Sequence, residues 1–452
     1  MNIAIFSGEL SGDLIAGALA LEIKAREPKA EFWGMGSHAL RGAGAELIAD
    51  SAEWGAIGIT EALKVAPKLF FKILPLVKRN LKNRRPDVVV LVDFGAFNVR
   101  VARYCKEIGL KVCYYFPPGS WRRHGTKGAE LAQITDVLAV PFTWAHERYK
   151  AMGANSVYVG HPLLERVRPS MSRNEFADSL GLSPDKPIIG LLPGSRKQEV
   201  VHLVPTLIET AKAILEHVPD AQFVMSVAPS ISQEMLGNWL SHHAEFHDRL
   251  ADIWHEFVYE AETKVLRPVA RTARRLSGQP IPQLVTSAGL VVSADQLEQE
   301  QKTKALHENL SRNKGLPPIV LAKGVTYDIM AYSQVLLSCS GTATLEATIF
   351  ETPIVIMYRG SKIMELESML RGTRKKLRFM GLPNIIADKP VVAELIQEQA
   401  NPQAITELVL PLLNDLTVRQ KMKAELRAIK ESLGEPGASA KAAELVLELA
   451  KK

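Results

Sequence analysis

The chain has 452 residues, of which 47% are hydrophobic and 23% are charged, and its formal net charge is +6. This composition excludes a largely disordered protein and favours anionic partners, and the length exceeds what one hydrophobic core usually supports, so we expect two domains. No apolar run approaches the roughly 20 residues that span a bilayer, which argues against an integral membrane protein.

The first third of the chain alternates short β-branched runs with helical patterns, which is typical of a parallel sheet with helices on both faces. The chain begins without the features of a signal peptide and enters its first expected strand at once. Strands are expected at 3–6, 32–33, 88–92, 111–116, 137–140 and 156–159, with a first helix from about Asp13. The run 88–92 is nearly all valine and leucine, which predicts a central strand buried on both faces.

A polar, proline-containing stretch over 166–186 is the expected linker between the domains. A second alternation follows, with strands expected at 188–192, 222–226, 319–321, 335–338 and 353–357. The predicted fold class is therefore α/β, with two doubly wound Rossmann-like domains facing a cleft, which is the GT-B arrangement. We assign 1–170 to the first domain, 187–428 to the second, and 429–452 to a C-terminal helix that could pack back on the first.

The segment at about 229–318 is too long for the short crossover that two neighbouring strands need, so we interpret it as an insertion. Apolar residues recur at helical spacing over 243–275, which favours a helical hairpin there. Its role cannot be inferred from the sequence.

Three glycine-containing turns follow expected strands and open helices, an arrangement whose free amide groups attract anions. In the first turn, Gly8 lets the backbone approach a ligand, and Ser11 or Asp13 can cap the helix. Glu9 is a carboxylate that a cap does not require. The alternative is that this segment is a turn and a helix cap only.

The second turn, Gly194-Ser195-Arg196, adds a guanidinium, whose fork of donors suits a diphosphate. Alternatively, Arg196 only pairs with Glu199 on the following helix.

The third turn contains Ser340, Gly341 and Thr342, whose small side chains allow close backbone approach to a ligand. Glu346 follows one turn into the helix, where its carboxylate can accept hydrogen bonds from ribose hydroxyls. An ordinary capped helix would open in a similar way, so both interpretations stay open.

Asp93 follows the expected central strand directly. A buried carboxylate is costly unless it is hydrogen-bonded or opens onto a cleft, so Asp93 is either a general base or a structural residue bonded to nearby amides. Asn98, five residues later, fits either role.

The stretch 60–85 is basic and interleaved with apolar residues, the pattern of a helix that lies on an anionic membrane. The alternative is a crossover helix packed on the sheet with a solvated basic back. Phe70 and Phe71 are candidate insertion residues, although either could instead pack on the sheet. Pro67 and Pro75 argue against one long straight helix.

Several other classes of site are disfavoured. The histidines and the three cysteines, Cys105, Cys113 and Cys339, lack metal or disulfide spacing, which also favours a reducing cytoplasm. No serine stands in a nucleophile-elbow context, and the basic stretch lacks a nucleic-acid-binding motif. We therefore expect no metal, no cofactor and no nucleic acid.

Taken in order, these segments resemble the lipid-A-disaccharide synthase family. The matching segments are 8–13, 58–63, 86–87, Asp93 with 97–98, 159–163, 191–196, 340–343 with 345–346, 358–359 and 382–384. They cover both expected domains and nearly the whole chain apart from the insertion.

The resemblance implies a metal-independent inverting glycosyltransferase that moves 2,3-diacylglucosamine from its UDP donor onto 2,3-diacylglucosamine 1-phosphate. The first domain would then face the acceptor and the membrane, and the second would bind the UDP-sugar. Cytoplasmic location, with peripheral attachment to the anionic inner membrane, is also implied. A homodimer is compatible with the sequence, which leaves the oligomeric state open.

The resulting site prediction combines the residues with the resemblance. The family's base maps to Asp93, and Glu9 falls in its active-site loop. The predicted catalytic residues are Asp93 and Glu9, and the predicted substrate-binding residues are Gly8, Ser11, Asn98, Gly194, Ser195, Arg196, Ser340, Gly341, Thr342, Glu346 and Asn384.

The chain departs from the family pattern at Ala96, where an aspartate is usual, at 116–123, where a tryptophan-rich serine-proline segment is usual, and at the insertion. The alternatives are another UDP-sugar GT-B enzyme with a different acceptor, a UDP-N-acetylglucosamine 2-epimerase, and a non-catalytic homologue that binds nucleotide or lipid.

Overall fold

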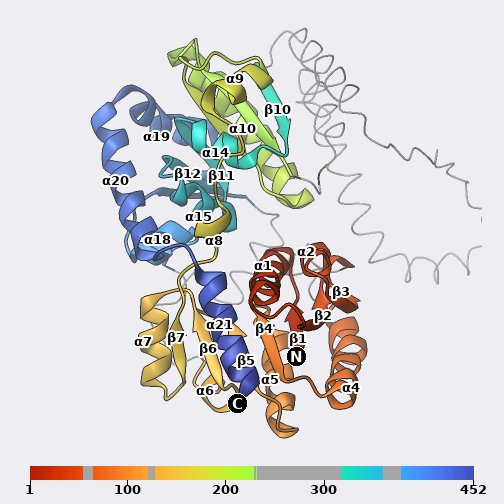
Figure 1. The fold of residues 1–452 in the computed structure, drawn as a ribbon. Helices are drawn as coiled ribbons and strands as arrows, with labels where there is room; N and C mark the ends of the chain where they lie inside the picture. The colour runs from red at the N-terminus through yellow and green to blue at the C-terminus, as the bar shows by residue number, and fades with distance from the viewer. Residues whose placement is uncertain (54–64, 121–127, 229–230, 232–316, 360–377) are drawn as a thin grey trace, which may run out of the picture.

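The computed structural model describes residues 1–53, 65–120, 128–228, 231, 317–359 and 378–452, arranged as two α/β units (Figure 1). The predicted insertion at about 229–318 lies almost entirely outside the described residues, and the predicted hairpin over 243–275 lies outside them altogether.

The first unit is built on seven parallel strands in the order β3-β2-β1-β4-β5-β6-β7. The strands are β1 (Asn2–Ser7), β2 (Glu31–Gly36), β3 (Glu46–Asp50), β4 (Val88–Val92), β5 (Val112–Tyr115), β6 (Val137–Val140) and β7 (Ser156–Tyr158). Every residue of β4 is buried, which confirms the predicted central strand. β3, at the edge of the sheet, was not predicted.

Helices cover both faces of this sheet. They are α1 (Leu10–Arg26), α2 (His38–Gly42), η1 (Ser51–Glu53), η2 (Lys68–Ile73), α4 (Leu74–Arg84), α5 (Gly95–Glu107), α6 (Leu131–Ile134), α7 (Thr143–Ala151) and α8 (Leu163–Arg166). Side chains alternate along each strand, so Ala4 and Phe6 of β1 face α4 and α5, whereas Ile3 and Ile5 face α1. Both faces are therefore apolar, as β-branched continuous runs require.

The second unit has six parallel strands in the order β10-β9-β8-β11-β12-β13. Its elements are α9 (Arg173–Leu180), β8 (Ile188–Leu192), α10 (Lys197–His217), β9 (Gln222–Val227), β10 (Ile319–Lys323), α14 (Thr326–Tyr332), β11 (Val335–Cys339), α15 (Thr342–Ile349), β12 (Ile354–Tyr358), α18 (Leu382–Ala387), β13 (Ala393–Ile396), η4 (Gln397–Gln399), α19 (Pro402–Asn414) and α20 (Leu416–Ser432). β13, another edge strand, was also not predicted.

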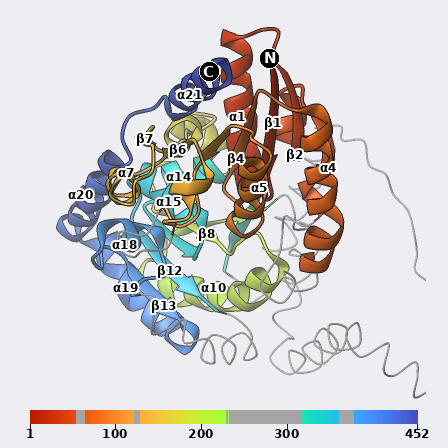
Figure 2. The ribbon, with the colours of Figure 1, turned by 90° about the horizontal axis from the view of Figure 1, so that it is seen from below.

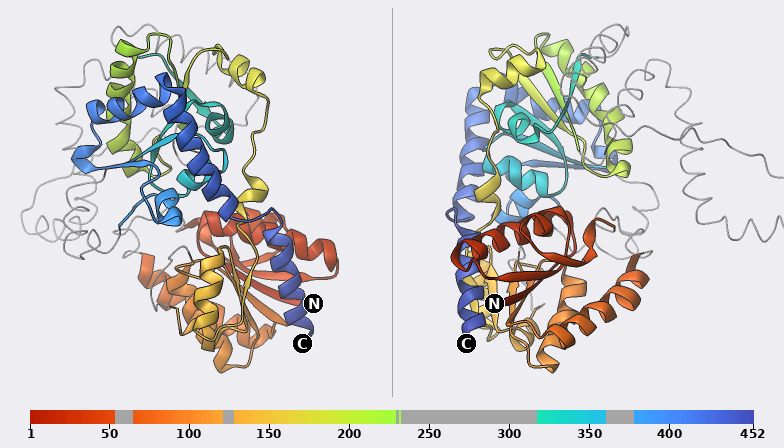
Figure 3. Two further views of the ribbon diagram at one scale, coloured as in Figure 1. Left: turned by 90° about the vertical axis from the view of Figure 1, so that its left-hand side faces the viewer. Right: turned by 45° about the vertical axis from the view of Figure 1, so that its right-hand side comes forward.

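The chain passes twice between the two units. The first passage, expected as a linker over 166–186, contains the short helix α9, which Ser172 and Glu175 cap reciprocally. The second passage leads from α20 into α21 (Ala438–Lys451), which packs against α1 and the first sheet (Figure 2). Both ends of the chain therefore lie in the same unit, as Figure 3 shows from two further sides.

The basic stretch is helical from residue 65 to 84, with the π-helical segment η2 leading into α4. The prolines were expected to argue against one long straight helix. The described residues are helical without a break, but the helix changes from the π-helical η2 to α4 just before Pro75, and Pro67 precedes η2. A π turn widens the backbone just where the Pro75 ring would otherwise meet the carbonyl four residues earlier. Leu69, Ile73 and Leu81 are buried toward the sheet, so the segment lies as a crossover helix with its basic side exposed.

Candidate active site

The loop between β1 and α1 carries Gly8 and Glu9. A Cβ atom on Gly8 would come within 2.1 Å of the Phe94 ring, so the absence of a side chain there is required by internal packing. Glu9 precedes the first residue of α1 and is exposed, and its carbonyl accepts the amide hydrogen bond of Asp13 at 2.8 Å. Ser11 is half-buried in the first turn of α1.

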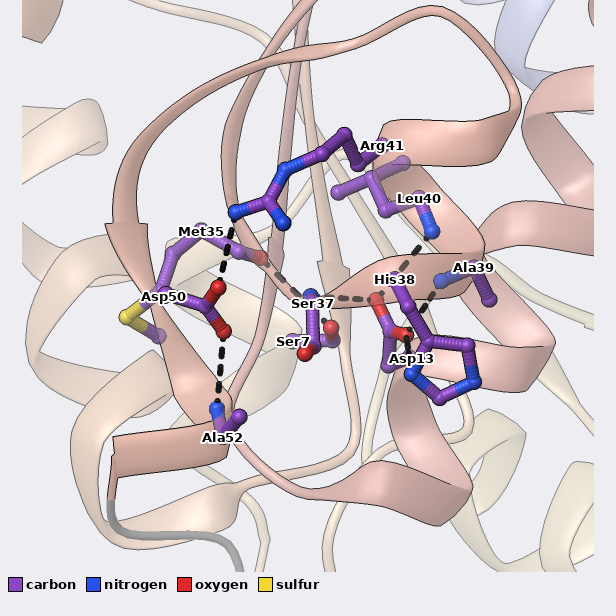
Figure 4. Close-up of polar contacts among 10 residues, drawn as sticks. All are labelled: Ser7, Asp13, Met35, Ser37, His38, Ala39, Leu40, Arg41, Asp50 and Ala52. Carbon is purple, nitrogen blue, oxygen red and sulfur yellow. Dashed lines mark hydrogen bonds and ion pairs between the residues drawn. The ribbon is translucent and has the colours of Figure 1, made fainter. Parts of the chain in front are cut away.

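The prediction that Ser11 or Asp13 caps α1 is wrong, because α1 has no side-chain cap. The fully buried Asp13 carboxylate instead accepts hydrogen bonds from three amides at the start of α2 (Figure 4). The donors are the backbone nitrogens of Ser37, Ala39 and Leu40, at 2.6, 2.8 and 3.3 Å. Asp13 therefore ties α1 to the turn after β2, because a helix start offers unpaired amides to a carboxylate.

Asp93 lies at the carboxyl end of β4, and its backbone has a φ of +47°, in the left-handed region that side chains other than glycine rarely adopt. Phe94 follows in the same region, with φ +50°. The Asp93 carbonyl accepts hydrogen bonds from the Tyr114 hydroxyl and the Asn98 amide, both at 2.9 Å. Two consecutive strained residues held by side chains turn the chain sharply at this point, a device common at functional sites.

Burial raises the pKa of the Asp93 carboxyl to about 6, and the negative charge of Glu9 adds to this effect. The amide of Phe94, which donates to the carboxylate, lowers the pKa by a smaller amount. A carboxyl group with a pKa near 6 is ionised at neutral pH yet basic enough to accept a proton, which suits a general base. The structure thus brings Asp93 and Glu9, the two predicted catalytic residues, into electrostatic contact.

Asn98 is fully buried in α5 and has an internal role. Its Nδ2 donates to the carbonyls of Phe6, Val92 and Asp93, at 3.2, 3.2 and 2.9 Å. The amide therefore fixes the strained turn that presents Asp93. Its Oδ1 is buried and has no hydrogen-bond partner among the described residues, so the predicted substrate contact of Asn98 stays a prediction.

The second predicted turn lies between β8 and α10. Arg196 is about half exposed, and its Nη1 donates to Glu199 Oε1 at 2.8 Å. The amides of Ser195 and Arg196 both donate to Glu199 Oε2 at 3.2 Å. Gly194 leaves room for this carboxylate, since a Cβ atom would approach it to 2.4 Å. Glu199 thus holds the donors that were expected to bind a diphosphate, which is the alternative recognised from sequence.

The third predicted turn lies between β11 and α15. Ser340 Oγ donates to the Met380 carbonyl at 3.2 Å, which joins this turn to the segment before α18. Gly341 and Thr342 are exposed, and no atom of the described residues lies within 4 Å of a Cβ built on Gly341. Within the described part of the chain, the front of α15 is therefore open.

Glu346 joins the second unit to the passage between the units. Its Oε1 accepts hydrogen bonds from the Tyr327 hydroxyl at 3.0 Å and from Arg166 Nη2 at 3.4 Å. Burial raises the pKa of Glu346, and Arg166 opposes this effect. Sequence reasoning missed Arg166 and Tyr327, and the residue pattern offers no signal that brings positions so far apart in the chain together.

The predicted substrate contact of Asn384 also gives way to a structural role. The side chain is 1% exposed and lies in α18. Its Oδ1 accepts the amides of Val391 and Val392, and its Nδ2 donates to the Val392 carbonyl and to Glu394 Oε1. These four bonds, all between 2.7 and 2.9 Å, use the whole amide to hold the turn before β13.

Two departures from the family pattern fall partly within the described residues. Ala96 is exposed at the second position of α5, and its carbonyl accepts Arg100 Nη1 at 2.5 Å. Phe116 has a φ of +61° and packs edge-on against Phe142 and His161. Residues 121–123 of the second departure lie outside the described part.

Within the described part, no group of three histidine, cysteine, aspartate or glutamate side chains is arranged to hold a metal ion. A search of the same residues finds no helix whose length and apolarity would let it cross a bilayer.

Comparison with known proteins places the chain in a family. The family model described as lipid-A-disaccharide synthetase matches residues 3–255 and 285–448. The lipid-A-disaccharide synthase of Syntrophus aciditrophicus (strain SB) is 30% identical over 453 residues, which cover 100% of this chain and 98% of that protein.

Solved structures at low identity show the fold alone. UDP-GlcNAc 2-epimerase from Neisseria meningitidis, bound to UDP-GlcNAc, gives a TM-score of 0.51 at 11% identity, with 100% of each chain covered. MurG of Acinetobacter baumannii gives 0.50 at 12% identity, with 99% of each covered. The predicted GT-B fold class is confirmed. Because the family model spans most of the sequence, the chain belongs to the lipid-A-disaccharide synthetase family and is a glycosyltransferase of lipid A biosynthesis.

Proposed function

We propose that the protein transfers 2,3-diacylglucosamine from UDP-2,3-diacylglucosamine to the 6-hydroxyl of 2,3-diacylglucosamine 1-phosphate, with inversion and release of UDP. The observation that carries this proposal is Asp93, a carboxylate presented by a strained turn at the end of β4 with a pKa of about 6. In this role Asp93 removes the proton of the acceptor hydroxyl as the new glycosidic bond forms. General-base assistance of this kind contributes typically 10²–10⁴-fold to the rate.

The donor would lie against the turns that precede α10 and α15. Arg196 and the amides of Ser195 and Arg196 form a donor set suited to a diphosphate, which would have to replace the Glu199 carboxylate that these donors now contact. Among the described residues, both hydrogen bonds to Glu346 are to Oε1, so Oε2 is the atom proposed to accept the ribose hydroxyls. The UDP-GlcNAc held by the Neisseria meningitidis epimerase of the same fold supports a UDP-sugar donor.

The proposed location is the cytoplasmic face of the inner membrane, reached through the helix over 65–84. Lys72, Arg79 and Lys82 are exposed on it, and Phe71 is 84% exposed. Phe70 packs inward against Phe97, so Phe71 is the insertion residue of this proposal. Basic side chains near an anionic surface contribute on the order of 1 kcal/mol each, which gives reversible attachment.

The reaction is tested by mass spectrometry of the products that the purified protein forms from UDP-diacylglucosamine and the acylated sugar phosphate. We expect the acylated disaccharide 1-phosphate and UDP, and an Asp93→Asn variant should lower the rate by roughly 10²–10⁴-fold with UDP affinity nearly unchanged. An altered UDP-sugar formed without acceptor would instead indicate an epimerase. Binding of UDP without any product would indicate a non-catalytic homologue.

Membrane docking is tested by co-sedimentation with anionic liposomes at increasing salt. Attachment should weaken as salt rises, and should weaken further when Lys72, Arg79 and Lys82 become glutamine. A glutamine variant that keeps the parent's melting temperature and binds as tightly would place docking elsewhere.

A further inference from the structure

An apolar hollow of about 430 Å³ opens on the surface where η2 meets α5. It is lined by Ala66, Pro67, Phe70, Phe71, Leu74 and Arg100. Five of these six side chains are apolar, and the sixth is a guanidinium. The hollow is wide open to solvent and does not form an enclosed cavity.

Packed aromatic rings connect this hollow to the proposed base. Phe70 stacks on Phe97 with ring centres 6.4 Å apart, and Phe97 lies 5.6 Å from Phe94. Phe94 directly follows Asp93 in the strained turn. Phe97, the middle ring, is 1% exposed, so packed core side chains link the hollow to the turn that carries Asp93.

Among the described residues, Arg100 is the only cationic side chain that lines the hollow. Its guanidinium lies over the Phe70 ring, 4.4 Å from the centre, and its Nη1 donates to the Ala96 carbonyl. Within the described part of the chain it makes no ion pair with a carboxylate. It stands about 8 Å along the axis from the first residue of α5, at the 1.5 Å rise of a helix.

The chemistry of the proposed acceptor matches this arrangement. In 2,3-diacylglucosamine 1-phosphate the phosphate is on carbon 1 and an acyl chain is on the adjacent carbon 2. A site for both needs a cation at the mouth of an apolar hollow. Arg100 and the rings of Phe70 and Phe71 supply that combination, and Asp93 lies just before α5, the helix that carries Arg100.

We infer that the hollow is the acceptor site: it takes the acyl chain on carbon 2, and Arg100 binds the 1-phosphate. This inference rests on the proposed function and assigns it a specificity determinant. It commits the hollow to the acyl chain of the substrate. Membrane docking, proposed above for the exposed basic side of the helix with Phe71 as the insertion residue, is a separate property that shares Phe71.

The test measures equilibrium binding of the acceptor in neutral detergent micelles by calorimetry, where no bilayer is present. Two acceptors are compared, diacylglucosamine with and without its 1-phosphate. Arg100→Gln should weaken binding of the phosphorylated acceptor by about tenfold, the usual scale for a charge-assisted contact near a surface, and leave the other acceptor unchanged. Arg100→Lys should restore part of the loss. The matched control is Arg103→Gln, on the same helix but paired with Glu130.

The apolar part is tested with acceptors of increasing acyl length. In the parent, affinity should rise with each methylene until the hollow is filled, and Phe71→Ser should flatten this dependence. The control is Leu21→Ser, which changes an exposed apolar residue on the distant helix α1 and should leave the length dependence unchanged. Phe71 is 84% exposed, so its replacement leaves the core intact.

Equal losses for both acceptors in Arg100→Gln would overturn the phosphate assignment. A Phe71→Ser variant that loses liposome binding but keeps the parent's length dependence would overturn the acyl-chain assignment and leave this face to the membrane. Product analysis distinguishes the proposed acceptor site from the proposed reaction. If the parent forms the disaccharide but the Arg100 and Phe71 variants bind both acceptors like the parent, only the assignment of the hollow is refuted. If the variants show the predicted binding pattern but the parent forms no product, only the proposed reaction is refuted.

Discussion

Replacing Glu9 with glutamine tests the electrostatic coupling at the proposed centre most directly. The charge of Glu9 is one of the two causes that raise the pKa of Asp93 from an ordinary 3.8 to about 6, and burial is the larger cause. Removing that charge should therefore lower the pKa of Asp93 by less than half of the full rise, or about 0.3 to 1 pH unit.

The magnitude is measurable in the acid limb of the pH profile. If Asp93 must be ionised to accept the proton, kcat/KM falls as pH drops through about 6. A decrease of about 0.5 unit raises the ionised fraction at pH 5 from about 9% to about 24%, so relative activity there should rise about 2.5-fold.

The assay is continuous UDP release at saturating donor between pH 4.5 and 8.5, with each profile normalised to its own plateau. Normalisation matters because the amide could also change the plateau if Glu9 contacts substrate. Glu31→Gln, at the amino end of β2 and thus at the opposite end of the sheet, is the matched control. If the acid limb of Glu9→Gln has the same midpoint pH as that of the parent, the coupling is refuted. If the midpoint shifts to higher pH, Glu9 acts on Asp93 through a contact of another kind.

Four further changes have expected outcomes. Protonated Asp93 stabilises the folded state, because the folded state binds this proton more tightly than the unfolded state; the stabilisation is present below pH 3.8 and is lost as pH rises through about 6. At pH 7 the ionised carboxylate lowers the free energy of unfolding by on the order of 3 kcal/mol. Asp93→Asn should therefore raise the melting temperature at pH 7 while abolishing most activity. Asp13→Ala leaves three buried or half-buried amides at α2 unpaired and should lower the free energy of unfolding by on the order of 3 kcal/mol, seen as a lower melting temperature. Glu199→Gln removes the carboxylate that competes for the proposed diphosphate donors and should tighten UDP binding about fivefold in calorimetry; weaker binding would mean that Glu199 orients Arg196 instead. Asn384→Ala should lower the melting temperature with no change in the UDP affinity of the folded protein, since its amide is used within the chain.

The parallel sheets were predictable because their central strands are continuous apolar runs. β4 and β8 have the predicted bounds, and all of their residues are buried. The two missed strands, β3 and β13, are at sheet edges and partly exposed, so polar residues interrupt their apolar pattern. A short strand covered on one side carries too little periodicity to be distinguished from a loop.

The site was predictable in its turns but not in its partners. A carboxylate after a buried strand marked Asp93 as either a general base or a structural residue, and its role as the base stays a prediction. Asp13 was expected only as a possible helix cap, and Asn384 was predicted from a segment that matches the family; both side chains instead accept hydrogen bonds from backbone amides of the chain. The hydrogen-bond partner of such a polar residue depends on packing between elements that are far apart in the chain, as the contact between Arg166 and Glu346 shows.

The return of α21 to the first unit sets an order for biosynthesis. Ile3 and Val90 lie on the sheet face that Ala442 and Val446 of α21 help to cover. During translation that face stays partly solvent-exposed until the last helix leaves the ribosome, by which time the whole second unit has already emerged. The N-terminal half of the protein therefore cannot complete its folding first, as vectorial synthesis usually allows. A nascent chain stalled before residue 438 should expose this apolar sheet face to holdase chaperones. A stop codon at that position should yield a protein that aggregates, although every proposed catalytic residue is present.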